Sequence, residues 1–346
     1  MTHASLVLIG TLLGIILHRT PVKSRTRLCI GVALGVMTAV LVPVTILRLS
    51  PDTHWLGPFI ASTFGFSTFF KCIAVAFYQY PDGVDNNLKT FVLWFIAIPE
   101  PVLAKGKLIR LTGQEVVHSI GLLILKILGL SVVLSFYRSV GVYPSEFVGG
   151  PETWYAPLIN GFVHLWFLYL FAAFCLDFSR VSFSLLFRAR FEAGFRNPLL
   201  ASRSLRECWG LRWDLPVQVM LKRSVYVPIR KAGGGRKMAT VFTFLASGML
   251  HEYNFSIHNA AVYEPGKVMI FFIIMGFMIL VEDLILNACP GYIRRLAEKT
   301  PTPIISTLLI LLAASPFESL FIKSWFEAGV VNATTEMFPH IFCQKK

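Results

Sequence analysis

The sequence predicts an all-α fold, a polytopic transmembrane helical bundle of about eight spans, and two observations carry that prediction. Apolar residues make up 55% of the 346 residues, charged residues make up 15%, and the mean hydropathy is +0.64. A soluble domain carries roughly 25% charged residues, so this chain has too few polar groups to cover its surface in water. The apolar residues also gather into runs of about 20, the length at which a helix crosses a bilayer. Soluble, disordered, collagen-like and coiled-coil classes are therefore excluded.

Eight apolar runs are candidate spans. They cover residues 4–18, 28–49, 55–77, 116–137, 154–176, 238–260, 268–286 and 303–326. The first run is short, and its basic residues follow the apolar stretch, which indicates a retained helix and not a cleaved signal peptide. Segment 91–98 is too short to span and is expected to lie at the interface or to dip into the bundle. We expect one domain over 1–346, with a cavity open to the cytosolic face.

The charges of the connecting loops predict the orientation. The connection after the first span holds four basic residues, the stretch 178–237 holds thirteen Lys or Arg against three acidic residues, and 287–300 has a net charge of +2. With eight spans, all three basic connections lie on one face, which is therefore cytosolic. The overall net charge of +13 is explained by this topology, so no nucleic-acid partner is expected.

The basic stretch 178–237 is longer than a simple connector needs. Within it, 181–195 (VSFSLLFRARFEAGF) predicts a basic amphipathic helix on the membrane surface. This helix either anchors the chain to headgroups or belongs to a cytosolic face that receives an anionic substrate. The three glycines at 233–235 predict a flexible break before the sixth span, and no P-loop pattern is present.

The sixth span carries polar groups that are costly in a bilayer and mark candidate functional sites. Ser247, His251, Asn254 and His258 stand at helical spacing and share one face. A zinc site would need a second histidine at position 255, which is Phe. Three roles are left for His251: a general base, the base partner of a Ser247 nucleophile, or a histidine satisfied by a neighbouring helix. The depth in the membrane favours the general base.

Other polar residues of the spans have structural interpretations. Lys71 and Lys126 are expected to snorkel or to pair, and Glu282 and Asp283 to lie at the cytosolic interface. The six cysteines lie far apart and form no CxxC pair. Their spacing predicts unpaired thiols, with neither a disulfide framework nor a metal site.

Three motifs follow one another in the second half of the chain. They are SLRECWGLRWDLPV at 204–217, RSVYVPIR at 223–230 and FLASGMLHE at 244–252. Together they resemble the eukaryotic wax synthase family of the membrane-bound O-acyltransferase superfamily, whose pattern is S-x-x-[DE]-F-W-G-R-R-W-N-L-P-V, R-x-x-V-Y-x-P-x-R and F-x-x-S-G-x-x-H-E. The segment at 66–77 (FSTFFKCIAVAF) is also similar to that family's early S-F-K-x-x-x-x-x-F segment.

Two of the departures from the family pattern matter for the site. Cys208 stands where the family has Phe, which changes the packing at that position. Asp214 stands where the family has Asn, so the partner of this side chain is left open.

The resemblance implies an acyltransferase that moves an acyl group from acyl-CoA to the hydroxyl of a lipophilic alcohol, first of all a long-chain fatty alcohol, giving a wax ester. It implies His251 and Asp214 as catalytic residues, the first as general base and the second as the group that orients the site. The expected substrate contacts are Trp209, Arg212, Trp213, Arg223, Tyr226, Arg230, Ser247 and Asn254.

The resemblance also implies the partners and the location. Acyl-CoA is a co-substrate, no cofactor or metal is expected, and the other partners are the alcohol and membrane lipids. The chain is expected in the endoplasmic reticulum membrane as a multi-pass protein. Two alternatives stay open: acylation of a sterol, glyceride or terpenoid alcohol, or a membrane transporter with an intramembrane proton relay. The absence of an internal sequence repeat weighs against a transporter.

Overall fold

The structure is a computed structural model that describes residues 3–49, 56–140, 155–258, 263–288, 290–291, 298–327 and 330–339. The chain divides into two compact units. Unit 1 comprises Met1–Thr112, Ser182–Glu192 and Pro216–Ala260, and unit 2 comprises Gly113–Val181, Ala193–Leu215 and Ala261–Lys346. The single domain expected over 1–346 stays a prediction.

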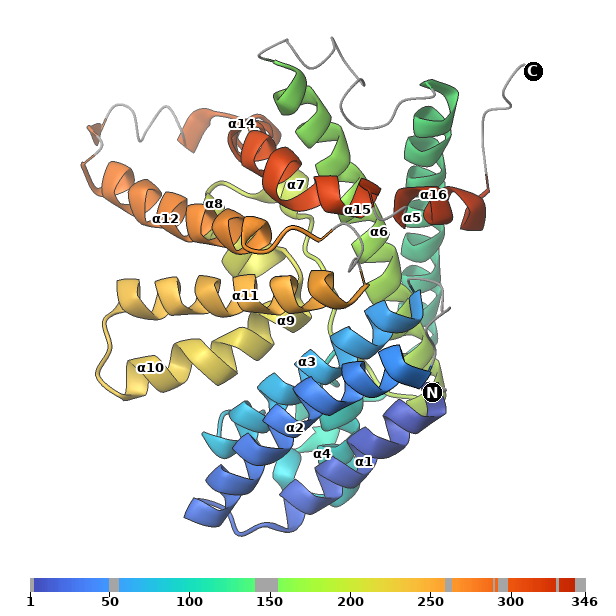
Figure 1. The fold of residues 1–346 in the computed structure, drawn as a ribbon, viewed down its shortest axis with the longest axis vertical. Helices are drawn as coiled ribbons and strands as arrows, with labels where there is room; N and C mark the ends of the chain where they lie inside the picture. The colour runs from blue at the N-terminus through green and yellow to red at the C-terminus, as the bar shows by residue number, and fades with distance from the viewer. Residues whose placement is uncertain are drawn as a thin grey trace. The chain divides into compact units, whose positions relative to one another are not determined.

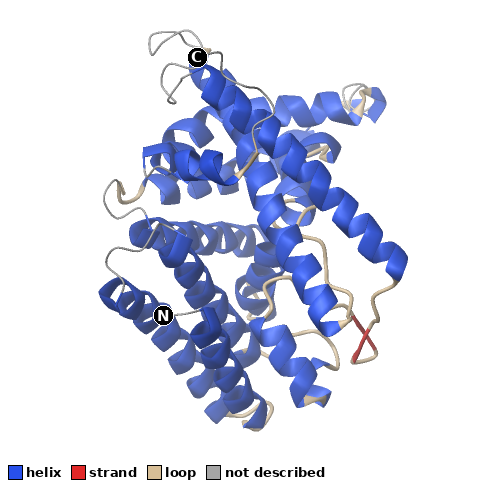
Figure 2. Cartoon of the chain, turned by 90° about the vertical axis from the view of Figure 1, so that its right-hand side faces the viewer, coloured by secondary structure: helices blue, strands red, loops and turns tan. Residues whose placement is uncertain are grey.

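Eight long helices coincide with the eight apolar runs, so the predicted all-α fold class is confirmed (Figures 1 and 2). These helices are α1 (His3–Arg19), α2 (Arg25–Leu49), α3 (Leu56–Ala76), α5 (Gly113–Val140), α6 (Ala156–Phe187), α11 (Arg236–His258), α12 (Lys267–Ala288) and α14 (Thr302–Phe317). Within the described ranges, α2, α3, α5, α6 and α12 are long and apolar enough to cross a membrane. Helices α1 and α14 are apolar but shorter, and polar residues lower the hydropathy of α11. The number of eight spans therefore stays a prediction.

The exposed surface of α5 is apolar. Val117 is 72% exposed and Leu125 is 64% exposed. Large apolar side chains gathered on one helix face are unfavourable in water and are typical of a surface that contacts lipid.

In unit 1, α2 and α3 run side by side (Figure 1). Gly31 and Gly35 of α2 permit this close approach, because a Cβ at Gly31 would lie 3.1 Å from the Cys72 carbonyl oxygen. Small residues at a helix contact let backbones pack closely, as is typical of helices within membranes. Helix α3 also packs against α11 through an apolar cluster. That cluster contains Phe66, Phe70, Met220, Leu221 and Leu250.

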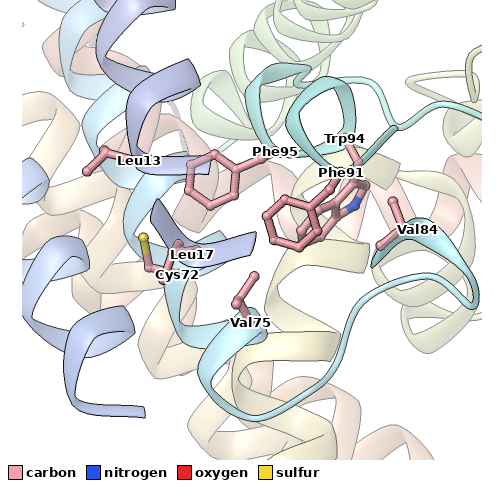
Figure 3. Close-up of a cluster of buried hydrophobic side chains, with 8 residues drawn as sticks. All are labelled: Leu13, Leu17, Cys72, Val75, Val84, Phe91, Trp94 and Phe95. Atoms are coloured by element: carbon pink, nitrogen blue, oxygen red, sulfur yellow. The ribbon is translucent and has the colours of Figure 1, made fainter. Parts of the chain in front are cut away.

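Helix α4 (Leu88–Ile96) occupies the segment that is too short to span. Asn87 caps it, because the side-chain oxygen of Asn87 accepts a hydrogen bond of 2.8 Å from the Lys89 backbone N–H. Its aromatic side chains are buried in a cluster with α1 and α3. Figure 3 shows that cluster, made of Leu13, Leu17, Cys72, Val75, Val84, Phe91, Trp94 and Phe95. Of the two expected placements, the one in which this segment dips into the protein is confirmed.

The amphipathic helix predicted over 181–195 is wrong. The apolar residues 181–187 instead continue α6, which ends where Arg188 takes a left-handed conformation with φ of 49°. The chain then pairs with the segment around the two-stranded sheet β1 (Leu103–Ala104) and β2 (Lys107–Leu108), through single bridges from Phe191 to Pro101 and from Ala189 to Arg110. Backbone pairing with this segment replaces the predicted surface helix.

The stretch 178–237, expected as a long loop, is largely helical. After α6 it contains α7 (Pro198–Ala201), α8 (Leu205–Glu207), η2 (Cys208–Arg212), α9 (Leu215–Leu221), η3 (Lys222–Tyr226) and α10 (Val227–Lys231). Elements η2 and η3 are π-helical turns, a form that is frequent at functional sites. The predicted break before α11 is confirmed, since Gly233 has a left-handed φ of 92°.

Unit 2 buries ionic pairs between its helices. Lys126 of α5 forms an ion pair with Asp177 of α6, and Arg180 lies 3.5 Å from the same carboxylate. The pairing expected of Lys126 is thereby confirmed. On α6, His164 Nδ1 lies 2.5 Å from Glu318, the first residue of the π-helical turn η4 (Glu318–Ile322).

Two short helices follow η4 in unit 2. The π-helical turn η4 is followed by α15 (Lys323–Glu327) and α16 (Val330–Met337). The basic residues Arg294 and Arg295, which helped to set the predicted orientation, lie outside the described residues.

Candidate active site

The first motif folds in unit 2 as a compact, hydrogen-bonded segment. Ser204 caps α8, with its hydroxyl accepting a 2.9 Å hydrogen bond from the Glu207 N–H. Glu282 of α12 accepts hydrogen bonds from the Leu205 and Arg206 backbone N–H groups at 2.7 and 3.0 Å. These contacts satisfy N–H groups that the start of a helix leaves without intrahelical partners.

Two arginines of this segment are held by carboxylates. Arg206 forms an ion pair with Asp283, so both acidic residues of α12 anchor the motif instead of simply marking the interface. Arg212 donates to Glu207 Oε1 from Nε at 2.8 Å and from Nη2 at 2.6 Å. Partial burial opposes the charge of Glu207, yet the hydrogen bonds from the Arg203 N–H and from Arg212 outweigh it and lower its pKa. The guanidinium of Arg212 is thus engaged by Glu207, and the expected contact of Arg212 with substrate stays a prediction.

The tryptophans of the motif lie in an aromatic cluster of the same unit. Trp209 and Trp213 have ring centroids 5.6 Å apart. Trp213 also lies 5.4 Å from Phe195, and Trp209 lies 6.2 Å from Phe272. This packing fixes the positions of the two indole rings. Their direct contact with a substrate stays a prediction.

Cys208 begins the π-helical turn η2. Its carbonyl accepts a 2.8 Å hydrogen bond from the Trp213 N–H, five residues on, which closes the wide turn. Burial raises the pKa of the Cys208 thiol to about 11. The thiol is therefore protonated at neutral pH and is not a nucleophile there.

Asp214 ends the segment in a strained conformation. Its φ of 39° is left-handed, a region that Asp and Asn tolerate better than other non-glycine residues. The next residue, Leu215, donates its N–H to the Gly194 carbonyl at 2.8 Å and opens α9. The family residue Asn tolerates the same backbone, so the conformation alone does not decide between a catalytic and a structural role for Asp214.

The third motif lies on α11 in unit 1 and places Ser247, His251 and Asn254 on one face. His251 Nδ1 lies 2.7 Å from the Ser247 backbone carbonyl oxygen. A carbonyl only accepts hydrogen bonds, so Nδ1 carries the proton, and in the neutral ring Nε2 then carries the lone pair. The geometry sets the tautomer that a base acting through Nε2 requires.

Asn254 lies one turn further along α11. It is 8% exposed, and its Oδ1 has no hydrogen-bond partner among the described residues. A buried amide oxygen without a partner is unfavourable, and it is a ready acceptor for a hydroxyl brought by a ligand. Ser247 is buried as well, at 9% exposed.

The helix that carries these residues is held by α2 and α3. The Tyr253 hydroxyl donates a hydrogen bond to the Ala39 carbonyl oxygen of α2. Its ring lies 5.3 Å from Phe66 of α3. The early motif at 66–77 thus supports the third motif directly.

The second motif holds an arginine in an ionic network that the sequence analysis missed. Arg223 forms an ion pair with Glu100, with Nη1 lying 2.6 Å from Oε2. Glu100 also accepts a 3.1 Å hydrogen bond from Trp94 Nε1. Lys71, which is 5% exposed, donates to the carbonyls of Trp94 and Ala97 at the end of α4. Lys71, expected to snorkel or to pair, is thus buried and bonded to backbone carbonyl oxygens, and a cation at a helix C-terminus is favourable.

The other two residues of the second motif are more accessible. Arg230 is exposed and donates to the Gly234 carbonyl at 2.8 Å. Tyr226 is half-buried at the end of η3.

The predicted site residues thus form two groups. Unit 1 holds Arg223, Tyr226, Arg230, Ser247, His251 and Asn254, and unit 2 holds Trp209, Arg212, Trp213 and Asp214. The proximity of Asp214 to His251 and the roles of all ten residues stay predictions. Glu100 is the residue that the structure adds to this candidate site. In the sequence it is a lone carboxylate between two prolines in an apolar stretch.

Comparison with known proteins confirms the resemblance given by the motifs. Residues 192–274 match the membrane bound O-acyl transferase family. Among curated proteins of Arabidopsis thaliana, the chain is 31% identical over 127 residues to "Probable long-chain-alcohol O-fatty-acyltransferase 7", covering 35% of this chain and 37% of that protein. It is 29% identical over 223 residues to "Probable long-chain-alcohol O-fatty-acyltransferase 2", covering 62% and 60%.

The name of a third relative gives a different acyl acceptor, a sterol. The chain is 34% identical over 156 residues to "Acyl-CoA--sterol O-acyltransferase 1" of the same plant, covering 43% of each. The chain spans less than two thirds of the length of each of these relatives. With the apolar helices, these matches identify an integral membrane protein of all-α fold.

Proposed function

We propose that this chain, a relative of the long-chain-alcohol O-fatty-acyltransferases, transfers an acyl group from acyl-CoA to the hydroxyl of a lipophilic alcohol. The observation that carries the proposal is the polar face of α11, inside the matched region. There His251 is tethered through Nδ1 to the Ser247 carbonyl, beside the buried Asn254. A base in a fixed tautomer next to an unsatisfied acceptor suits an alcohol substrate.

The reaction needs one proton acceptor and no covalent enzyme intermediate. His251 Nε2 takes the hydroxyl proton of the alcohol as its oxygen attacks the thioester carbonyl carbon. The carbon–sulfur bond then breaks, and the departing thiolate takes the proton from the imidazolium. The products are an ester and coenzyme A, and His251 returns to its starting tautomer because Nδ1–H stays bonded to Ser247.

The donor carries phosphates that favour a cationic surface. Unit 1 exposes Lys222, Arg230, Lys231, Arg236 and Lys237 around α10 and the start of α11. Lysine and arginine bind phosphate oxygens by charge-assisted hydrogen bonds. These exposed side chains are better placed for this role than Arg212 and Arg223, whose guanidinium groups are engaged by Glu207 and Glu100.

A long-chain fatty alcohol is the proposed acceptor, so the product is a wax ester. The chemistry at His251 is the same for a sterol, a glyceride or a terpenoid alcohol, and the printed names of the relatives include a sterol acyltransferase. The endoplasmic reticulum, where such lipids would be made, is the proposed location.

The proposal is tested with the purified full chain in proteoliposomes, given radiolabelled acyl-CoA and a panel of a fatty alcohol, a sterol and a diacylglycerol. Thin-layer chromatography should reveal labelled wax ester as the main product, absent from a His251→Ala sample. Sterol ester or triacylglycerol as the main product would reassign the acceptor. Ion or proton flux without any ester would favour the transporter alternative and overturn the proposal.

A further inference from the structure

Arg27, near the start of α2, is the most completely buried charged side chain among the described residues. It is 1% exposed, and Nε, Nη1 and Nη2 all lack a hydrogen-bond partner within the described part of the chain. A guanidinium stays charged at any physiological pH and offers five N–H donors. A buried charge with no partner is strongly unfavourable, so the arrangement is incomplete without an anion.

The surroundings of Arg27 form a partly aromatic box. Its Cζ lies 5.5 Å from the centre of the Tyr80 ring and 6.0 Å from that of Phe91. His18 packs edge-on against Phe91, with ring centroids 5.2 Å apart. Figure 3 shows the apolar side of this region, where Phe91 lies beside Trp94. The rings attract the cation but accept no hydrogen bond from its N–H groups within the described residues.

The carboxylate of Asp85 lies beside these rings but is bonded to Tyr80. Asp85 Oδ2 accepts a 3.0 Å hydrogen bond from the Tyr80 hydroxyl, and the Asp85 backbone oxygen lies 3.1 Å from His18 Nε2. Asp85 forms no ion pair with Arg27 in the described ranges. Tyr80 and His18 therefore hold Asp85 in place, and the Asp85 carboxylate does not pair with Arg27.

The position of Arg27 in the chain indicates the source of the anion. The candidate span of α2 begins at Arg25, so Arg27 lies near one end of a membrane helix, close to the level of lipid phosphates. Arg19 and Lys23 on the same connection are exposed and add positive charge. Tyr80 and His18 are half-buried, so this side of the box reaches the surface.

We propose that Arg27 binds the phosphate of an anionic phospholipid, whose headgroup enters as the Tyr80 ring swings aside. The guanidinium fork matches two phosphate oxygens, and the neighbouring basic residues attract the headgroup. This lipid site is separate from the proposed acyl transfer at His251 and does not depend on it.

The test measures lipid binding by the full chain in detergent. Mixed micelles of detergent and phosphatidylcholine are titrated with phosphatidic acid, and inorganic phosphate is added in a parallel arm. Thermal unfolding and lipid retention by native mass spectrometry are recorded. Wild type should be stabilised by phosphatidic acid and should retain it. Arg27→Gln should weaken binding by about tenfold, equivalent to one charge-assisted contact, whereas the matched control Arg25→Gln, an exposed arginine two residues away, should bind within about twofold.

Two further variants keep the test decisive if Arg27→Gln folds poorly. Arg27→Lys keeps the charge and loses the planar fork, so it should bind with intermediate affinity. Asp85→Asn removes the negative charge that is hydrogen-bonded to Tyr80 and should tighten binding of an anion.

The proposal would be overturned by equal loss in the Arg25 and Arg27 variants, by no response of wild type to phosphatidic acid, or by weaker binding in Asp85→Asn. Coenzyme A is added in a further arm, and displacement of the lipid by it would also overturn the proposal, because it would place Arg27 in the donor site. Full stabilisation by inorganic phosphate alone would overturn the lipid as the source of the phosphate.

Discussion

Segment 204–214 and the polar face of α11 differ in how their polar side chains are bonded. In the first, Arg206, Arg212 and Glu207 are each engaged by a charged partner. In the second, His251 is tethered to the backbone, and the buried Oδ1 of Asn254 has no partner in the described residues. Polar groups that bond to one another stabilise the local fold. A buried acceptor with no partner destabilises the fold, and a ligand that donates a hydrogen bond to it removes that cost. The comparison assigns structure to the first region and chemistry to the second.

The largest effect is expected from His251→Ala. Losing a general base reduces a rate by about 10²–10⁴-fold, while the apolar packing of α11 on α3 is unchanged. Initial rates with radiolabelled acyl-CoA measure the loss. Ser256→Ala is the control, because Ser256 is exposed on the same helix; a His251→Ala rate near that of Ser256→Ala would remove His251 from catalysis.

Asp214 is the last residue of segment 204–214, and three variants decide whether its role is structural or catalytic. Asp214→Asn should keep most activity, since Asn retains an oxygen acceptor and tolerates the left-handed φ of 39°. Asp214→Ala should lose on the order of 10²-fold, as expected when reacting groups are misplaced. Asp214→Gly separates the causes, because glycine accepts this backbone without any side chain. We expect Gly to be as inactive as Ala; a fully active Gly variant would make Asp214 a conformational residue of the scaffold.

Lys71 of α3 holds the end of α4 through two hydrogen bonds to backbone carbonyls. Lys71→Met removes two hydrogen bonds to carbonyls at the end of α4 and should lower the free energy of unfolding by about 1–3 kcal/mol. Lys89→Met, an exposed lysine on α4 itself, is the matched control and should change little. Thermal unfolding in detergent measures both, and equal melting temperatures for the two variants would contradict a structural role for Lys71.

The smallest effect is expected from Arg212→Gln. The pair with Glu207 is partly exposed, so its loss should cost about 0.5–1 kcal/mol. Because the folded pKa of Glu207 is lowered, the pair stabilises the fold above the ordinary carboxyl pKa, and this contribution is lost as the pH falls through the folded pKa. Unfolding midpoints measured across acidic pH should converge for wild type and Arg212→Gln. A difference that grows on acidification would show that another group is responsible.

Hydropathy predicted the eight long helices because the length and apolar content of a run are local properties. The polar face of α11 was predicted for the same reason, from spacing alone. The helical character of 178–237 was missed because its two π-helical turns depend on five-residue backbone bonds such as that from Trp213 to Cys208. The partners of Lys71 and Arg223 also could not be predicted, because they come from positions 23 to 123 residues away and are set by packing.

Acyl transfer per folded molecule, measured for His251→Ala and Arg212→Gln beside wild type, separates a catalytic role of α11 from a structural role of segment 204–214. The rate is divided by the folded fraction, taken from thermal unfolding of the same sample. We expect His251→Ala to unfold at the wild-type temperature and to have lost its rate, while Arg212→Gln unfolds at a lower temperature and keeps a rate per folded molecule close to wild type. The opposite pattern, an active His251→Ala and a stable but inactive Arg212→Gln, would contradict the assignment of chemistry to α11.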